Sequence, residues 1–318
     1  MAATRFAWAR GGTATLTAFF LLCFLLALGA MRSDLFPDQS ASLVPQMQRE
    51  AVTFALMALV AALFSLARRA KWPRSRQLWN SVVIGLGLFA APAVLVYLSR
   101  EWISSLTRVA LISLVPLFAV VFEPYIGAAS AHSRTGLSKT SLPGALVAVL
   151  GSLCIFPVAV PSSIQTGAAF AAVIVAAACV AAANCYAVRV ACESPPIALA
   201  PMAAVACAAS AVSLVAATAL TSGLVLQGNA IVTHLGWSAA ISLPGFCLLF
   251  WLMPRMSAPR MTTRFVFAPL VAILFSTVLD QPSGGLQIYL GILLIAAGAG
   301  WLLFAPEEEP DAGSSLHL

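Results

Sequence analysis

The sequence predicts an all-α integral membrane protein with about ten transmembrane helices, arranged as two inverted five-helix repeats. Three observations support this prediction: an apolar composition, ten apolar runs separated by short loops, and a pattern that recurs in both halves of the chain. Of the 318 residues, 61% are hydrophobic and 9% are charged, and the mean hydropathy is +0.97. A water-soluble globule of this composition would expose a large apolar surface, so lipid must solvate most of the side chains.

Ten apolar runs are long enough to cross a bilayer, which takes about 20 mostly apolar residues. In chain order they predict transmembrane helices at residues 13–31, 51–67, 79–98, 105–125, 143–160, 166–188, 196–222, 233–253, 263–280 and 286–304. The first run is followed by Arg32-Ser33-Asp34 and lacks the small-residue cleavage pattern of a signal peptide, so it is predicted to be a retained helix. The loops are too short to hold a soluble domain.

Lysine and arginine are distributed unevenly over the predicted loops, and this distribution sets the orientation of a membrane protein. With a cytosolic amino terminus, the inner side collects 13 of the 17 basic residues and the outer side four. The inner residues are Arg5, Arg10, Arg68, Arg69, Lys71, Arg74, Arg76, Arg134, Lys139, Arg189, Arg255, Arg260 and Arg264, and the outer residues are Arg32, Arg49, Arg100 and Arg108. The sequence therefore predicts a multi-pass protein of the plasma membrane, a bacterial inner membrane, with both termini cytosolic.

Composition argues against several other classes of protein. The formal net charge is +6, but the basic residues lie in short clusters between apolar runs, so nucleic acid is not an expected partner. The seven cysteines form no CxxC pair and only three histidines are present, so neither a metal site nor a cofactor is predicted. The expected partners are the lipid bilayer and a small molecule, and a homodimer is compatible with the sequence.

A pattern around the fourth predicted span recurs around the ninth. Ser104 precedes the fourth span and Pro116 lies near its middle, and Ser257 and Pro269 follow them at a constant offset of 153 residues. Ten spans with both ends on one side divide into five plus five, and an odd repeat unit places the second copy upside down. The sequence thus predicts a first repeat over residues 1–160, an inverted second repeat over 161–305, and a disordered acidic tail over 306–318.

Paired glycines mark the fifth and tenth predicted spans. Gly144 and Gly151 lie seven residues apart in the fifth span, as do Gly291 and Gly298 in the tenth. Seven residues are nearly two helical turns, so both glycines of a pair lie on one face and allow a neighbouring helix to approach closely. Close packing between helices is favoured for them over contact with a ligand.

These patterns together resemble a known family. A small-residue start, Pro-Leu-x-Ala-x within the helix and a following Gly-x6-Gly helix occur twice, which is similar to the drug/metabolite transporter superfamily, specifically the EamA-type permeases. The resemblance covers residues 13–304 and implies secondary transport, commonly export of amino acids, metabolites or drugs. The chain departs from the family in the acidic residue after the proline-containing helix, since Glu123 comes only seven residues past Pro116 and Asp280 eleven past Pro269. A Trp-Gly pair common in the first helix is missing.

The predicted function is therefore secondary transport of a small metabolite, by alternating access and in the efflux direction. An ion gradient is the expected energy source, because the sequence contains no GxxxxGK[ST] motif for ATP. A membrane-embedded enzyme is an alternative, but the zinc-protease motif HExxH is absent and no enzyme activity is predicted. A non-transporting scaffold is a third class, against which the repeat argues, because a scaffold needs no pair of pseudo-symmetric halves.

Ionisable groups at membrane depth are rare and costly, so each is a candidate functional group. Glu123, toward the inner end of the fourth span, is predicted to couple transport to an ion, with an interfacial pair to Arg134 or Lys139 as the alternative. Arg108, near the outer end of the same span, is predicted to bind a carboxylate or phosphate of the substrate through its planar guanidinium. Snorkelling of Arg108 to the outer headgroups is the alternative.

Four uncharged side chains are further candidates for substrate contact. Tyr97 is predicted to line an outer vestibule at the end of the third span. Asn184 and Tyr186 interrupt an alanine-rich sixth span, where hydrogen bonding between helices is favoured over substrate contact. Trp237 is the last candidate, with a place in the aromatic belt at the membrane surface as the alternative.

Two prolines are candidate hinges. Pro116 and Pro269 fall near the middle of their predicted spans, where proline removes a backbone hydrogen bond and kinks the helix. Such a pseudo-symmetric pair of kinks suits a protein that alternates between two conformations around a central site.

Overall fold

The computed structural model describes residues 2–31, 45–127, 141–156, 158, 160–193, 199–225, 228–280 and 285–304, without the side chains of 2–11, 229–230 and 276–280. These residues form helices joined by turns, and no strand occurs among them. The α-helices are α1 (Ala2–Ala30), α3 (Gln46–Ala67), α4 (Arg76–Gly85), α5 (Ala91–Ser99), α6 (Ser105–Ile112), α7 (Val115–Phe122), α8 (Ser141–Ile155), α9 (Ile164–Glu193), α10 (Leu199–Thr221), α11 (Gly228–Trp237), α12 (Leu243–Leu252), α13 (Ala258–Thr262), α14 (Arg264–Asp280) and α15 (Leu286–Phe304). Three π-helical segments are η2 (Leu86–Ala90), η3 (Glu123–Gly127) and η5 (Ser238–Ser242). The prediction of an all-α protein is confirmed.

Nine helical stretches within the described ranges are long and apolar enough to cross a membrane. Several consist of consecutive segments: α4, η2 and α5 form one stretch, Arg76–Ser99, and α6, α7 and η3 form another, Ser105–Ile126. Segments α11, η5 and α12 contribute Ile231–Leu252 in the same way. The chain is therefore a multi-pass membrane protein, as its composition predicts.

Helix α8 occupies the fifth predicted span but is shorter than predicted. Its 15 residues rise about 22 Å at 1.5 Å per residue, less than the roughly 30 Å thickness of the hydrocarbon core. The helix ends at Ile155, two residues before Pro157 in the sequence, and the residue that precedes a proline is disfavoured in the α conformation. Proline thus ends this helix before the apolar run ends.

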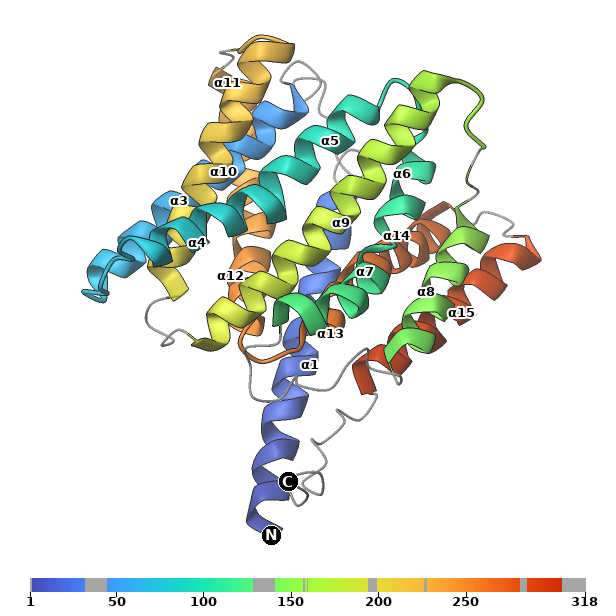
Figure 1. Cartoon of the computed structure of the whole chain (residues 1–318), viewed down its shortest axis with the longest axis horizontal. Coiled ribbons are helices and arrows are strands. Elements are labelled where there is room, and N and C mark those ends of the chain that lie inside the picture. The colour runs from blue at the N-terminus through green and yellow to red at the C-terminus, as the bar shows by residue number, and fades with distance from the viewer. Residues whose placement is uncertain are drawn as a thin grey trace, which may run out of the picture.

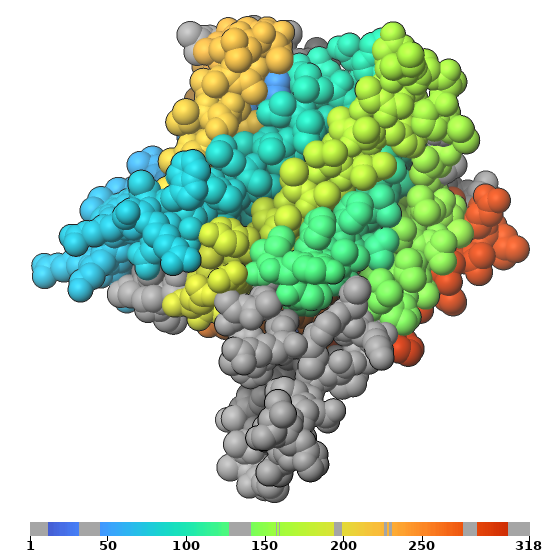
Figure 2. Space-filling view, viewed as in Figure 1, coloured from blue at the N-terminus to red at the C-terminus, as the bar shows by residue number. Residues whose placement is uncertain are grey.

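The helices pack in a small number of close pairs around α9, which crosses the bundle (Figure 1). Helix α9 contacts α4, α5 and α7, and α1 contacts α12 and α14. Two further pairs are α8 with α15 and α3 with α10. Figure 2 shows α4, α5, α9, α7 and α8 as adjoining bands across one face of the molecule.

The surface is apolar and the interior carries polar groups, which is the distribution expected where lipid is the solvent. Exposed apolar side chains include Leu59, Leu63 and Leu66 on α3, Val212 and Leu220 on α10, and Leu290, Leu293 and Trp301 on α15. Buried polar side chains include Gln48, Ser81, Thr107, Asn184, Ser210, Thr218, Thr262 and Arg264. Many of these buried groups are hydrogen-bonded to backbone carbonyls, as membrane burial demands.

The four glycines of the fifth and tenth predicted spans face one another between α8 and α15. A Cβ atom on Gly151 would lie 2.8 Å from the carbonyl oxygen of Gly291, and one on Gly298 would lie 2.6 Å from that of Gly144. The two backbones therefore meet where only a hydrogen atom fits. The prediction of close packing between helices is confirmed.

Replacing Gly298 with leucine is expected to destabilise the protein by about 1–3 kcal/mol, because the new side chain overlaps the α8 backbone. Gly300→Leu provides a matched control on the same helix, since a Cβ at Gly300 would have open space around it. Thermal unfolding in detergent should show a lower midpoint for Gly298→Leu and a near wild-type midpoint for Gly300→Leu. Equal midpoints would refute the close contact between α8 and α15.

Candidate functional site

Two helical stretches are interrupted in the same way in the two halves of the chain. In η2 the backbone N–H of Ala91 donates to the carbonyl of Leu86, and in η5 the N–H of Leu243 donates to that of Ser238, both five residues back. These π-helical segments begin 152 residues apart, and each is followed two residues beyond its end by a proline, Pro92 or Pro244. A proline ring clashes with the carbonyl four residues earlier, and a wider turn relieves the clash.

The stretches that follow them are interrupted as well. The fourth predicted span breaks at Ser113 and Leu114, just before Pro116. The ninth predicted span is the continuous helix α14, which contains Pro269. The interruption on this stretch, at Thr263 between α13 and α14, lies at the start of the predicted span, six residues before that proline. The structure thus places Pro116 at a break and Pro269 beyond one.

The starts of these two stretches are equivalent in backbone conformation. Ser104 precedes α6 with φ −64° and ψ 156°, and Ser257 precedes α13 with φ −65° and ψ 157°. Only Ser104 caps its helix with a side-chain hydrogen bond, from the N–H of Thr107 at 3.2 Å. The 153-residue offset in the sequence therefore corresponds to equivalent local structure.

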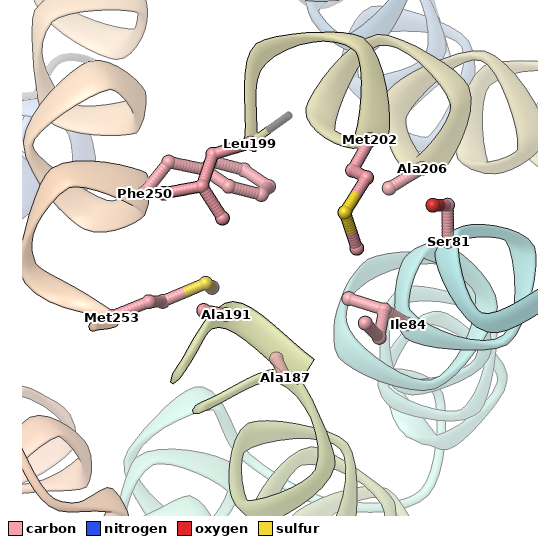
Figure 3. A pocket seen from close by; sticks show the side chains of 9 residues that line it. All are labelled: Ser81, Ile84, Ala187, Ala191, Leu199, Met202, Ala206, Phe250 and Met253. Carbon is pink, nitrogen blue, oxygen red and sulfur yellow. The ribbon is translucent and has the colours of Figure 1, made fainter. Parts of the chain in front are cut away.

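A pocket lies among α4, α9, α10 and the end of α12 (Figure 3). Its empty volume, which includes open solvent, is about 290 Å³. The lining residues are Ser81, Ile84, Ala187, Ala191, Leu199, Met202, Ala206, Phe250 and Met253. Only Ser81 contributes a polar side chain, and its hydroxyl donates to the carbonyl of Gln77 at 2.8 Å, so the pocket suits an apolar group.

The pocket lies at one end of the bundle, which we call the basic end because it carries Arg76, Arg189 and Arg255. These arginines lie close in sequence to the pocket wall, at the start of α4, near the end of α9 and just after α12.

A chain of phenylalanine rings leads away from the pocket. Phe250 lines the pocket, and its ring centroid lies 5.0 Å from that of Phe246. Phe246 contacts Phe89 of η2 at 5.1 Å, and Phe89 contacts Phe54 of α3 at 4.9 Å. These rings join the two interrupted stretches that contain η2 and η5. Movement of either stretch therefore changes the packing at the inner wall of the pocket.

Asn184 and Arg264 form a buried pair near the pocket. Asn184 is fully buried on α9 and Arg264, on α14, is 4% exposed. One guanidinium nitrogen of Arg264 donates to Asn184 Oδ1 at 2.9 Å and the other donates to the carbonyl of Met261 at 2.8 Å. The sequence assigns Arg264 to the inner end of the ninth predicted span, and in the structure its side chain is buried between helices.

Tyr186 also joins two helices. Its hydroxyl donates to Oδ1 of Asn80 on α4 at 2.8 Å. The structure therefore gives both Asn184 and Tyr186 hydrogen bonds between helices, the role that the sequence favoured for them. Their contact with a substrate stays a prediction.

At the opposite end of the bundle, Tyr97, Arg100 and Arg108 lie close together. The Arg100 guanidinium lies 3.8 Å from the ring centroid of Tyr97, which is buried between α3, α5 and α10. Arg108 donates to the carbonyl of Val96 at 3.4 Å, and its Nε has no hydrogen-bond partner. Arg108 therefore contacts the backbone next to Tyr97, and the outer vestibule predicted for these residues stays a prediction.

Glu123 lies where α7 gives way to η3, beside the end of α9. On that helix Cys185 donates to the carbonyl of Ala119 at 3.6 Å, and Arg189 donates to the carbonyl of Ile126 at 3.3 Å. The alternative partners of Glu123, Arg134 and Lys139, lie outside the described residues. Arg189 instead pairs with Glu193 at 3.1 Å.

A polar cluster at His234 received no role from the sequence. His234 Nε2 lies 2.9 Å from the carbonyl oxygen of Arg49 and 2.9 Å from the Thr53 hydroxyl, and Ser238 Oγ lies 2.8 Å from the same hydroxyl. A carbonyl only accepts, so a hydrogen bond to Arg49 is made by the tautomer that carries a proton on Nε2. The cluster joins α3 to the segment just before η5. No spacing pattern links residues 181 positions apart, so this cluster has no signature in the sequence.

The remaining predicted residues have less defined surroundings. Trp237 is half-buried at the end of α11, beside η5. The side chain of Asp280 lies outside the described part of the chain. Within the described residues, no three histidine, cysteine, aspartate or glutamate side chains group in a way that could hold a metal ion.

Comparison with known proteins identifies a fold and no family. No family model matches the chain, and neither does any curated protein. Among solved structures, 26 chains match. One of them, described only as "Crystal structure of protein", has a TM-score of 0.72 and 18% sequence identity over 92% of this chain and 99% of that chain. At this identity the likeness shows a shared fold alone.

Proposed function

We propose that the chain is a secondary transporter that exports a small metabolite by alternating access, driven by an ion gradient. The observation that carries the proposal is the paired interruption at η2 and η5, 152 residues apart, in two stretches that flank the apolar pocket. Broken helices beside a central site are characteristic of secondary transporters. π-Helical turns inside α-helices are frequent at functional sites.

The packing of the helices supports an arrangement of two inverted repeats, residues 1–160 and 161–305. Exchanging every span for the one five places later turns the contact of α5 with α9 into that of α12 with α1, and the contact of α7 with α9 into that of α14 with α1. The pairs α8 with α15 and α3 with α10 map onto themselves. A set of contacts that survives this exchange is expected from pseudo-twofold symmetry in the membrane plane.

The resemblance to EamA-type permeases is part of the same proposal. Two features support it: Ser104 and Ser257 begin the two proline-containing stretches with equivalent backbone conformations, and the four paired glycines meet between α8 and α15. The family resemblance supports ten spans, with α8 as the fifth, and secondary transport.

The basic end is proposed to face the cytosol, with both termini on the same side. Positive residues favour the cytosolic side, and Arg76, Arg189 and Arg255 lie at this end. In a variant without native cysteines, Ser75→Cys should react with an impermeant reagent only from the cytosol, and Ser162→Cys only from outside. Both positions are exposed. The reverse pattern of labelling would invert the orientation.

The pocket is proposed to be the cytosolic part of the substrate pathway, and Tyr97, Arg108 and Trp237 its outer part. The apolar lining of the pocket and the charged group at Arg108 together suit an amphipathic metabolite. Glu123, at membrane depth near the basic end, is proposed to carry the coupling ion.

Transport by the purified protein in liposomes tests the proposal. A panel of mass-detected amino acids, organic acids and amphipathic drugs should include compounds that cross faster with the protein than without it. An imposed pH gradient should speed their movement further. Liposomes that carry the protein but move no compound above the protein-free rate, with or without the gradient, would contradict the proposed function.

A further inference from the structure

Arg264 is a cation held in the interior of the bundle by neutral groups. Its guanidinium donates to the Asn184 amide oxygen and the Met261 carbonyl, and it lies 4.5 Å from the ring centroid of Phe265. Within the part of the chain that the structure describes, no carboxylate pairs with it. A buried charge without a counterion is costly, and the cost is larger at membrane depth.

The guanidinium also retains capacity for further hydrogen bonds. Of its five N–H groups, the two described hydrogen bonds use two. The planar arrangement of these donors matches the oxygens of a carboxylate or a phosphate, which a single guanidinium can bind through two parallel hydrogen bonds. Neutral acceptors hold Arg264 in place without neutralising it.

The buried pair lies on the face of α9 that forms the pocket wall. Asn184, Ala187 and Ala191 are spaced by three and four residues, so they share one face of the helix, with Asn184 one turn deeper. Figure 3 shows Ala187 and Ala191 on this helix at the edge of the pocket. A ligand whose apolar part occupies the pocket can therefore extend a polar group along α9 toward Asn184.

We propose that Arg264, positioned by Asn184, binds the oxyanion group of an amphipathic substrate whose apolar part occupies the pocket. Calling the ligand a substrate rests on the proposed transport function, whereas binding of an oxyanion at Arg264 can be tested without transport. It assigns the substrate to the carboxylates and phosphates. Arg264 thereby becomes a second candidate for binding the anionic group of the substrate, besides Arg108, which lies toward the other end of the bundle.

Ligand-dependent stability tests the site directly. The intact chain, purified in detergent, is unfolded by heat while sodium acetate or sodium phosphate replaces sodium chloride at constant ionic strength. We expect at least one of the two oxyanions to raise the unfolding midpoint in a saturable way, since a ligand that binds the folded state stabilises it. Arg264→Gln should weaken the apparent affinity by about tenfold or more, because hydrogen bonds to charged groups are among the strongest.

Two further variants separate binding from structure. Asn184→Asp keeps the shape of the side chain and places a carboxylate on Arg264, so it should raise the midpoint in chloride and abolish the response to oxyanions. Arg255→Gln removes the same charge from an exposed arginine at the basic end and should respond like the wild type. Asn184→Asp also provides a test if Arg264→Gln does not fold.

Three results would overturn the oxyanion site. They are a wild type that shows no saturable shift with acetate or phosphate, an Arg264→Gln variant that responds like the wild type, and an Asn184→Asp variant that keeps the full response. None of these results bears on whether the liposome panel finds transport. Conversely, a saturable shift in a protein that transports nothing would support the site and contradict the proposed function.

Discussion

Replacing Ala187 with phenylalanine is expected to lower the transport rate to about a tenth of the wild-type rate or less. Ala187 is buried in the wall of the apolar pocket, and a phenyl ring at this position projects toward the space between α4, α9, α10 and α12. Substrate then has to displace the ring or force the helices apart, and overpacking of this kind costs about 1–3 kcal/mol, against 1.4 kcal/mol for each tenfold change. Initial transport rates in liposomes measure the effect.

Ala171→Phe is the matched control for Ala187→Phe. Ala171 lies on the same helix, α9, but is exposed, so its replacement adds the same ring on a surface away from the pocket. Both variants should insert into the membrane, and Ala171→Phe should also unfold at the wild-type midpoint. Equal transport rates for Ala187→Phe and the wild type would remove the pocket from the substrate pathway.

Replacing Glu123 with glutamine is expected to abolish the acceleration of transport by a proton gradient. The amide keeps the shape of the side chain but loses the group that binds a proton at membrane depth. The ratio of the rates with and without an imposed pH gradient should fall to about one, while exchange of substrate without a gradient continues. The measurement is the same liposome assay at several values of external pH.

Glu101→Gln is the control for coupling, because Glu101 is exposed at the opposite end of the bundle. It should leave the response to the gradient intact. If transport by Glu123→Gln still depended on the gradient, Glu123 would not be the coupling residue. His234 would then be the next residue to replace, since its ring hydrogen-bonds across to α3, where Arg49 and Glu50 are the neighbouring charged residues.

The membrane-spanning helices could be predicted from hydropathy because a run of apolar residues can be recognised along the sequence without knowledge of tertiary contacts. Nine stretches of the described helices match predicted spans, and the paired glycines report close packing because their seven-residue spacing fixes a common helix face. The short helix α8 was the exception. Its apolar run continues past Ile155, and hydropathy counts apolar residues without registering the proline that ends the helix.

Interruptions inside the spans were harder to predict. A π-helical turn leaves hydropathy unchanged, so η2 and η5 are invisible to a search for apolar runs. Pro92 and Pro244, 152 residues apart, are the sequence signal for η2 and η5, in addition to the pair Pro116 and Pro269 in the fourth and ninth predicted spans. A search of every predicted span for prolines separated by 152 or 153 residues finds both pairs.

The polar interior is a property of the folded bundle. Counting arginines by loop assigned Arg264 to the membrane surface, because it lies near the end of an apolar run. Its partner Asn184 is 80 residues away, and the link between them depends on how α9 and α14 pack. The same holds for Tyr186 and Asn80. Sequence patterns therefore identified polar residues in spans without identifying which of them meet.

Alternating access is the central claim, and spin-label distances between the two interrupted stretches test it most directly. One pair of labels, at Gln77 and Arg255, spans the basic end, and a second pair, at Leu98 and Val232, spans the opposite end, all at exposed positions. The account predicts two populations in lipid whose balance shifts between acidic and alkaline pH, with one distance lengthening as the other shortens. A single unchanging distance at both ends, or two distances that lengthen together, would contradict it.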